Sequence, residues 1–267
     1  ASNSLILGYS DIQDYRTPSS SNFAFPQVEI AANGGTIFLG NEREATVFNM
    51  KQKTFEFTNN ITWFKGDHTF LVGTHNELYN INYGFVNSWN GRVSYKSVAD
   101  FLASNVNRVR GSYSFTNNDR DYIYNNPYAT FNVGLYSVYA QDEIQVNEKF
   151  KLSPGIRFDL ASTDAPNLSP KLASTPTDVN AGTTYTAATP LNKVSNSIFG
   201  QVLFSPRLGF NYDVNGDRST IVRGGTGIFT GRIPFAWLGY AFYNDGVGFG
   251  AFDVNNVAGK NVGDVLK

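Results

Sequence analysis

Two histidines, His68 and His75, are the only ones in the chain, and Glu77 follows the second closely. Imidazole and carboxylate groups are zinc ligands. This separation does not match a helical zinc pair, and one nearby carboxylate does not complete a ligand set. The sequence therefore predicts no metal site at these histidines.

Residues 213–217 (DVNGD) imitate the start of a calcium-binding loop. The sixth position of the loop is Arg218 where that pattern needs Gly, and the twelfth is Gly224 where it needs Glu. These departures favour a tight turn. Residues 117–121 (NNDRD) have the oxygens of a loop cation site, but a solvated loop tip is the favoured interpretation.

Residues 224–227 (GGTG), with Gly231, resemble a phosphate-binding loop in composition. Neither the Lys-Ser/Thr pair nor a helical pattern follows, so glycines that allow close backbone approach in a strand are favoured. The chain has no Cys and no GxSxG motif, and nothing marks a catalytic carboxylate pair. We therefore expect no catalytic residues, no cofactor and no enzyme activity.

The composition narrows the class of protein. Aromatic residues make up 15% and charged residues 16% of the 267 residues, and the net charge is −1. Ordinary soluble domains carry roughly 25% charged residues. The charge balance argues against a nucleic-acid partner, and no apolar run is long enough for a transmembrane helix. This combination suits a transmembrane β-barrel, although a soluble β-sandwich has similar statistics.

Three predicted hairpins position these residues, near 54–79, 131–160 and 204–231. The last is the clearest, because apolar and small or polar residues alternate strictly from Phe204 to Val214 before the hairpin signal Asn215-Gly216. The arms reach the roughly 9–11 residues that a tilted strand needs to cross a bilayer.

Less regular segments lie between these hairpins. The pattern predicts a strand at 4–11, a small hairpin at 28–38 and one short helix at 97–104. We expect loops at 13–26, 80–130 and 163–196, the middle one polar and rich in aromatics. Pro154 lies inside a predicted strand, which indicates a sheet edge, a bulge or a local break in the ladder.

The connections differ sharply in length. Each hairpin turns within about three residues, whereas the connections between hairpins are roughly ten times longer, the asymmetry of outer-membrane barrels. We therefore predict an all-β, antiparallel up-and-down transmembrane β-barrel. Its lipid-facing residues would include Phe150, Leu152, Ile156 and Phe158, and its lumen residues Arg157, Arg207, Asn211 and Asp213. Trp63, Tyr79, Tyr139 and Tyr212 suit aromatic girdles on the exterior.

Three segments carry a family resemblance: Ile61–Tyr79 (ITWFKGDHTFLVGTHNELY), Tyr139–Asp159 (YAQDEIQVNEKFKLSPGIRFD) and Phe204–Trp237 (FSPRLGFNYDVNGDRSTIVRGGTGIFTGRIPFAW). They resemble the barrel of TonB-dependent outer-membrane receptors, most closely the Oar-like receptors of Bacteroidota. The resemblance implies a bacterial outer-membrane protein with a 22-stranded barrel, an N-terminal plug, and import driven through the TonB energy-transducing complex.

The sequence departs from that family pattern. It has room for about seven of the strands, and neither a plug nor a TonB-contacting box is found in it. We therefore expect a middle part of the barrel, which would not fold on its own because two sheet edges would stay open. The partners would be outer-membrane lipid, TonB through an N-terminal region, and an extracellular ligand or surface-exposed partner protein.

Two aromatic-rich segments are the candidate ligand surface. Amphipathic aromatics and Arg give a large contact area at low entropic cost. We expect the two segments to meet above the barrel mouth, and the alternative is that their aromatics only pack the loops together. The second functional hypothesis is a soluble surface β-sandwich that binds glycan or protein. The candidate residues are Tyr83, Trp89, Arg92, Tyr95, Trp237, Tyr240 and Tyr243.

Overall fold

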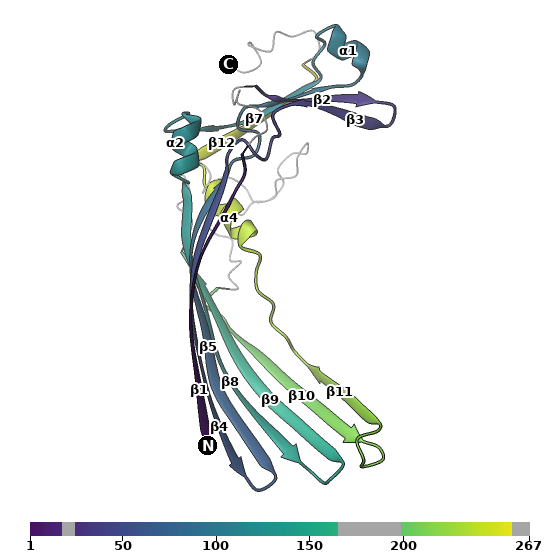
Figure 1. The fold of residues 1–267 in the computed structure, drawn as a ribbon. Coiled ribbons are helices and arrows are strands. Elements are labelled where there is room, and N and C mark those ends of the chain that lie inside the picture. The colour runs from purple at the N-terminus through teal and green to yellow at the C-terminus, as the bar shows by residue number, and fades with distance from the viewer. Residues whose placement is uncertain (18–24, 165–198, 258–267) are drawn as a thin grey trace, which may run out of the picture.

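A computed structural model gives the fold and describes residues 1–17, 25–164 and 199–257. A seven-stranded sheet forms a long curved wall, and a five-stranded sheet lies across one end of it (Figure 1). Three short helices are described: α1 (Val98–Leu102), α2 (Arg120–Asn125) and α4 (Phe235–Tyr243). None of the described helices is long and apolar enough to cross a membrane.

The wall is antiparallel throughout. Its β-strands follow each other in chain order across the sheet, which confirms the predicted up-and-down arrangement. In spatial order they are β1 (Ser2–Tyr15), β4 (Phe48–Lys65), β5 (His68–Phe85), β8 (Ala129–Gln145), β9 (Phe150–Thr163), β10 (Val202–Asp213) and β11 (Ile221–Gly227).

The connections of the wall sort by end, as predicted. Residues 66–67, 146–149 and 214–220 make the short turns at one end, which we call the turn end. Residues 25–47 and 86–128 lie at the opposite, loop end, where they build the five-stranded sheet together with residues 249–255 (Figure 1). The predicted loop at 163–196 begins within β9, and its residues from 165 onward lie outside the described residues.

The small sheet at the loop end corrects the predicted loop at 80–130. β5 continues to Phe85, and the following residues form strands and helices, because their backbone groups pair with distant segments. The prediction that 97–104 is the only helix was therefore too narrow, although Ser97 does cap α1 as expected. The strands are β12 (Phe249–Asn255), β7 (Arg108–Ser114), β6 (Arg92–Tyr95), β2 (Gln27–Ala32) and β3 (Gly35–Gly40), in spatial order.

The two faces of the wall differ in polarity. Arg157 pairs with Ser205 across β9 and β10, so Arg207 lies on the same face two residues further along. Arg157 lines a cavity on the concave side together with residues of α4, which places this polar face inside the curve. Leu208 points outward. The predicted lumen assignment of Arg157, Arg207, Asn211 and Asp213 is confirmed by this register.

The convex face is apolar and uncovered. Leu7, Phe204 and Leu208 are 62%, 52% and 44% exposed, and no second sheet packs on them among the described residues. Ile156 and Phe158 are exposed as predicted, while Phe150 and Leu152 are half-buried by neighbours on the same face. A β-sandwich would bury this face, so the soluble alternative is wrong.

Two of the four predicted girdle residues lie on the wrong face for that role. Trp63 and Tyr212 are exposed on the convex side. Tyr79 shares the concave face with Glu77, where it is buried, and Tyr139 donates its hydroxyl to Asn60 at 2.6 Å on that face. Tyr79 and Tyr139 lie on the concave face because a strand places alternate residues on opposite faces, whatever their type.

The hairpin of β10 and β11 turns less tightly than its Asn-Gly signal predicts. Residues 214–220 form a loop whose positive φ angles fall at Gly216 and Arg218. The Val214 N–H donates to the Thr220 carbonyl at 2.9 Å, and the strand ladder resumes at Ile221. The Asp213 carboxylate accepts backbone N–H groups from Gly216 at 2.9 Å and Arg218 at 2.8 Å. Its oxygens therefore hold the turn together. The sequence analysis likewise favoured a turn over a calcium-binding loop at these residues.

Two local predictions inside the strands hold. The ladder of β8 and β9 lacks the pairs Asp142–Pro154 and Glu143–Ser153, which is the local break expected at a proline. Gly225 in β11 approaches the β10 backbone so closely that a Cβ would lie 2.9 Å from the Leu208 carbonyl oxygen. The glycines of β11 therefore serve close packing.

Candidate functional site

A segment that we call the inward segment, residues 228–243, leaves β11 and turns into the concave side of the wall (Figure 1). It carries α4, which packs on β5 and β8. The Phe235 and Tyr79 rings are 4.6 Å apart edge to face, and Phe242 stacks on Phe131 at 4.6 Å. Gly239 lies against the Tyr83 ring, where a Cβ would come within 2.3 Å.

One ion pair ties the inward segment to the wall. The Arg232 guanidinium donates to both oxygens of the Glu77 carboxylate, at 2.7 and 2.6 Å. It also lies over the Tyr79 ring, 5.4 Å from the centroid. The Glu77 side chain is only 14% exposed, whereas Arg232 is 52% exposed. Both bonds come from Nη2, so this charge-assisted contact holds Arg232 against the wall close to the start of α4.

Polar groups continue along the concave face beside this pair. His75 lies 2.6 Å from the Thr58 hydroxyl through Nδ1 and 3.6 Å from Glu77 through Nε2. His68 lies on the opposite, convex face and contacts Asp142 at 2.6 Å. The two histidines therefore do not approach each other, and no cluster of three metal-ligating side chains occurs among the described residues.

Two arginines lie further along the concave face. Arg157 donates to Asp159 at 2.7 Å and to the Ser137 hydroxyl at 2.6 Å. Arg207 donates to Gln141 at 2.9 Å. Both guanidiniums are held by neighbours in the wall, so their positions are fixed before any ligand arrives.

A cavity of about 280 Å³ lies between the wall and the inward segment. Both arginine–carboxylate pairs and His75 line it, together with the apolar side chains of Phe235 and Leu238. The lining combines charges of both signs with one apolar side. Such a surface can hydrogen-bond a polar solute, and its carboxylates are occupied by ion pairs.

The small sheet contains the predicted Arg92, in a buried charge cluster. Glu29 accepts hydrogen bonds from the Arg92 guanidinium, from Arg110 at 2.9 Å and from the Ser94 hydroxyl at 3.0 Å. Burial raises the pKa of Glu29, but the hydrogen bonds and the two positive charges outweigh it and lower that pKa below its ordinary value. Arg92 is thus bound within the sheet.

Most other predicted ligand residues also pack inside the protein. Trp89 meets the Phe249 ring edge-on at 6.4 Å, and Tyr243 stacks on the same ring at 4.7 Å. The structure therefore brings the two aromatic segments together, through β12 as well as through these rings. Tyr83 is buried under α4, and Tyr95 packs on Phe101.

Two predicted residues remain exposed, Trp237 at 72% and Tyr240 at 53%. Both lie on α4, so they belong to the concave side of the wall and not to a loop above its mouth. The sequence analysis weighed Glu77 only as a metal ligand beside His75, and it did not single out Arg232. Their pairing spans 155 positions, and no local spacing predicts it. The alternation of residues along β5 places His75, Glu77 and Tyr79 on one face, and this pattern could have indicated that Glu77 belongs to the concave site.

Residues 117–121 cap a helix. Asp119 accepts the backbone N–H of Tyr122 at 2.6 Å at the start of α2, and Asn118 accepts that of Ser114 at 2.8 Å. Asn117, Asn118 and Asp119 thus each accept a backbone N–H, and Asp121 accepts from the Arg120 guanidinium at 2.8 Å.

A curved antiparallel wall with an apolar outer face and a polar inner face defines a membrane-spanning β-barrel protein. The chain matches the family described as "Outer membrane beta barrel domain" over residues 3–262, and it belongs to that family. It is therefore an outer-membrane protein whose convex face contacts lipid. No curated protein and no solved structure matches it.

Proposed function

We propose that this barrel is part of a TonB-dependent active importer of the Oar-like type. The observation that carries the proposal is the inward segment, which occupies the concave side and is tied to the wall by Arg232 and Glu77. A solute that follows this wall must pass or displace the segment. Passage that requires displacement fits gated, energised import better than free diffusion.

The resemblance to Oar-like receptors supports the proposal of a TonB-dependent importer. The short turns and the long connections lie at opposite ends of the wall, which also fits an outer-membrane barrel. In this proposal the loop end faces the cell exterior. Ligand is captured there and reaches Trp237 and Tyr240, the exposed aromatics of α4. Transport needs no covalent step and no cofactor from these residues.

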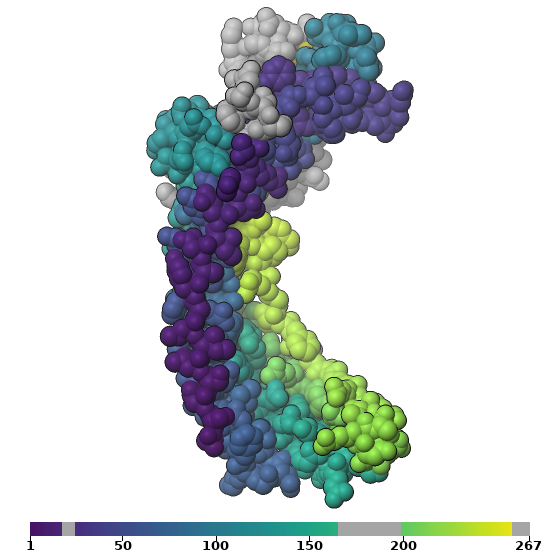
Figure 2. All heavy atoms as spheres, in the orientation of Figure 1, coloured from purple at the N-terminus to yellow at the C-terminus, as the bar shows by residue number. Residues whose placement is uncertain are grey.

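The wall is one part of a larger barrel in this proposal. In the part of the chain that the structure describes, β1 and β11 each pair with one neighbouring strand, and Figure 2 shows β1 (dark purple) along the margin of the molecule. Hydrocarbon cannot satisfy open backbone groups, so further strands pair with both edges. We place the plug and the TonB-contacting region outside these 267 residues.

The test compares three strains in one defined medium that contains mixed peptides and oligosaccharides: the parent, a strain without this gene, and a strain without tonB. Mass spectrometry of the spent medium identifies the compounds that each strain removes. We expect at least one compound that the parent depletes and neither deletion strain depletes. Restoring the gene should restore its depletion.

Two outcomes would overturn the proposal. Depletion that needs this gene but continues without tonB would identify a passive channel. Identical depletion by all three strains, with the barrel present in the parent membrane, would remove the transport role.

A further inference from the structure

The strand β3 is the outer edge of the small sheet. Among the described residues it pairs only with β2, and all six of its residues are exposed. Figure 1 shows the hairpin of β2 and β3 projecting from the loop end over the concave side of the wall. Ile37, Phe38 and Leu39 are 44%, 62% and 42% exposed. A row of apolar side chains therefore stands beside an open backbone edge.

The turn of this hairpin determines which backbone groups the open edge offers. Residues 33–34 both have positive φ, 48° and 78°, so they form a two-residue turn that makes Ala32 and Gly35 the first hydrogen-bonded pair. Antiparallel pairs alternate between hydrogen-bonded and non-hydrogen-bonded positions. The N–H and C=O groups of Thr36 and Phe38 consequently point away from β2, toward the open edge.

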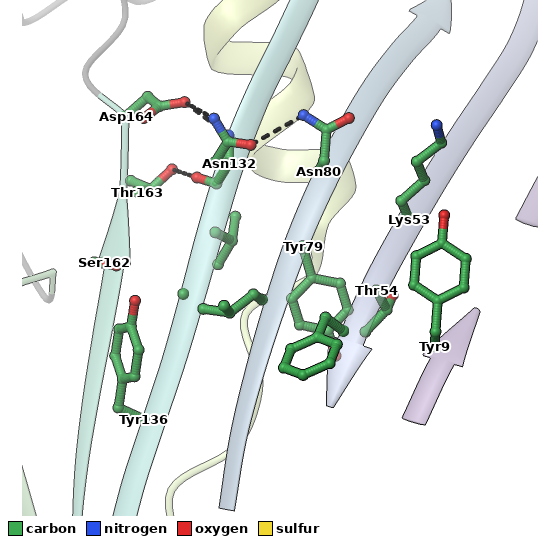
Figure 3. Close-up of a pocket in the computed structure, with 14 residues that line it drawn as sticks. Tyr9, Lys53, Thr54, Tyr79, Asn80, Asn132, Tyr136, Ser162, Thr163 and Asp164 are labelled. Atoms are coloured by element: carbon green, nitrogen blue, oxygen red, sulfur yellow. Dashed lines mark hydrogen bonds between the residues drawn. The ribbon is translucent and has the colours of Figure 1, made fainter. Parts of the chain in front are cut away.

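This edge lies outside the hydrocarbon of the membrane. On the convex face near the loop end, the Asn80 amide donates to Asn132 at 3.0 Å, and the Asn132 amide donates to Asp164 at 3.0 Å (Figure 3). This row of polar groups crosses three strands, so the apolar face that contacts lipid ends at its level. The small sheet lies beyond the row, and β3 therefore faces water.

The edge of β3 lacks the protection that exposed edge strands usually carry, such as Lys, Pro, a bulge or a charge. Its sequence is Gly-Thr-Ile-Phe-Leu-Gly, and its ladder with β2 is unbroken. The opposite edge of the same sheet, β12, carries Asp253, which accepts a hydrogen bond from Arg108 at 2.6 Å. Of the two edges, β3 is therefore the one built to receive another strand.

The groups at the end of β3 indicate the charge of that strand. Gly40 ends β3, and two residues later the Glu42 side chain is 56% exposed, with Arg16 3.9 Å away. Glu42 also lines a pocket of about 430 Å³ together with Phe38 and Glu44. A strand that pairs antiparallel with β3 brings its N-terminus to this end. An ammonium group at that terminus would meet the Glu42 carboxylate.

We propose that β3 binds an extended peptide by strand addition, antiparallel and with its amino end at Glu42. The backbone groups of Thr36 and Phe38 hydrogen-bond the peptide main chain, and Ile37 and Leu39 pack against its alternate side chains. Main-chain amides repeat at the spacing of this edge, whereas sugar hydroxyls do not. The inference rests on the proposed function, in which the loop end captures ligand, and it names a peptide with a basic amino end as the ligand class.

The test uses the full-length protein in detergent and a probe peptide as long as β3, the six residues Lys-Val-Thr-Val-Thr-Val with a fluorescent label at the carboxyl end. Fluorescence anisotropy measures its binding, and hydrogen exchange reports on β3. N-methylation at every second residue blocks one edge of the peptide and leaves the other free, whereas N-methylation at adjacent residues blocks both edges. This comparison needs no change in the protein.

Two variants test the protein side of the contact. Thr36→Pro removes an N–H that points to the open edge, and Glu42→Gln removes the carboxylate. Asp121→Asn on α2, where the side chain is 79% exposed, is the matched control for the change of charge. Unchanged hydrogen exchange of β2 in Thr36→Pro would show that the small sheet stays folded.

We expect the peptide to slow the exchange of β3, and the probe with one free edge to bind as well as the unmodified probe. The probe with both edges blocked should bind roughly tenfold or more weakly. Thr36→Pro and Glu42→Gln should each weaken binding roughly three- to tenfold, the effect of one lost hydrogen bond, and Asp121→Asn should not weaken it.

Three results would overturn the proposal. The first is equal binding of the probe with both edges blocked, and the second is an equal loss in Asp121→Asn. The third is strong protection of β3 without peptide, which would show that another strand of the protein or of a second copy covers the edge. The assay scores binding and not uptake, so its failure is distinguishable from failure of the transport proposal.

Discussion

At the scale of single residues, the pair of Arg232 and Glu77 is the sharpest feature of the concave side. Replacing Arg232 by Ala leaves a nearly buried carboxylate without its charged partner and frees the start of α4. We expect a larger single-channel conductance of the full-length protein in planar bilayers. Arg218→Ala, in the turn at the opposite end, is the matched control. Equal conductance of the two variants would remove the ion pair from any gating role.

Glu29 gives a pH prediction in the small sheet. Its pKa is lowered in the folded protein from an ordinary value of 4.5, so the unfolded state binds its proton first as the pH falls. The stability that this carboxylate contributes is complete above about pH 4.5 and is lost as the pH drops through the folded pKa.

Hydrogen exchange of β2 and β6 measures this loss. We expect protection to be constant from pH 7 to pH 5 and to fall below pH 4.5, once the exchange rates are corrected for intrinsic pH dependence. Glu29→Gln should be less protected at neutral pH and should lack the acid step. An acid step of the same size in that variant would assign it to another carboxylate.

Residue positions show what the sequence could predict. Alternation along β10 assigned Arg207 inward and Leu208 outward, because a strict period of two leaves one choice. The same rule was not applied to Tyr79 and Tyr139, whose amphipathic rings suggested the exterior. Their faces follow from ladder pairs with strands far along the chain.

At the scale of elements, α4 tests how the inward segment is held. Gly239 faces the Tyr83 ring so closely that Gly239→Ala must shift one of them, whereas Gly231 in the same segment has open space around it. We expect Gly239→Ala to lower the opening free energy of α4 by about 1–3 kcal/mol, the cost of overpacking. Hydrogen exchange of residues 235–243 is the measurement, and Gly231→Ala is the control. A loss in both variants would point to glycine flexibility and not to the Tyr83 contact.

The elements differ in how well the sequence predicts them. Long hairpins were predicted because their turns and alternation are local signals. The helix α4 was not, since Pro234 at its N-cap supplies no side-chain hydrogen bond and its residues are apolar nearly all round. The strands β6, β7 and β12 are short, and they form through pairing with distant segments, which no local pattern records.

At the scale of the whole molecule, the two open edges of the wall carry the last prediction. Among the described residues, β1 pairs only with β4 and β11 only with β10, so one side of each edge strand has no strand partner there for its N–H and C=O groups. Each such group costs several kcal/mol in hydrocarbon. An edge of this length can be stable in a membrane only when another strand covers it.

We therefore expect these 267 residues, expressed alone and refolded in detergent, to give no heat-resistant folded band on a gel. The full-length gene product, refolded in parallel, should give one, because its further strands pair with β1 and β11. Size-exclusion chromatography of the shorter chain should show association, since its exposed edges can pair with other copies. A monodisperse monomer that unfolds cooperatively would show that the wall needs no further strands, and it would contradict the larger barrel proposed above.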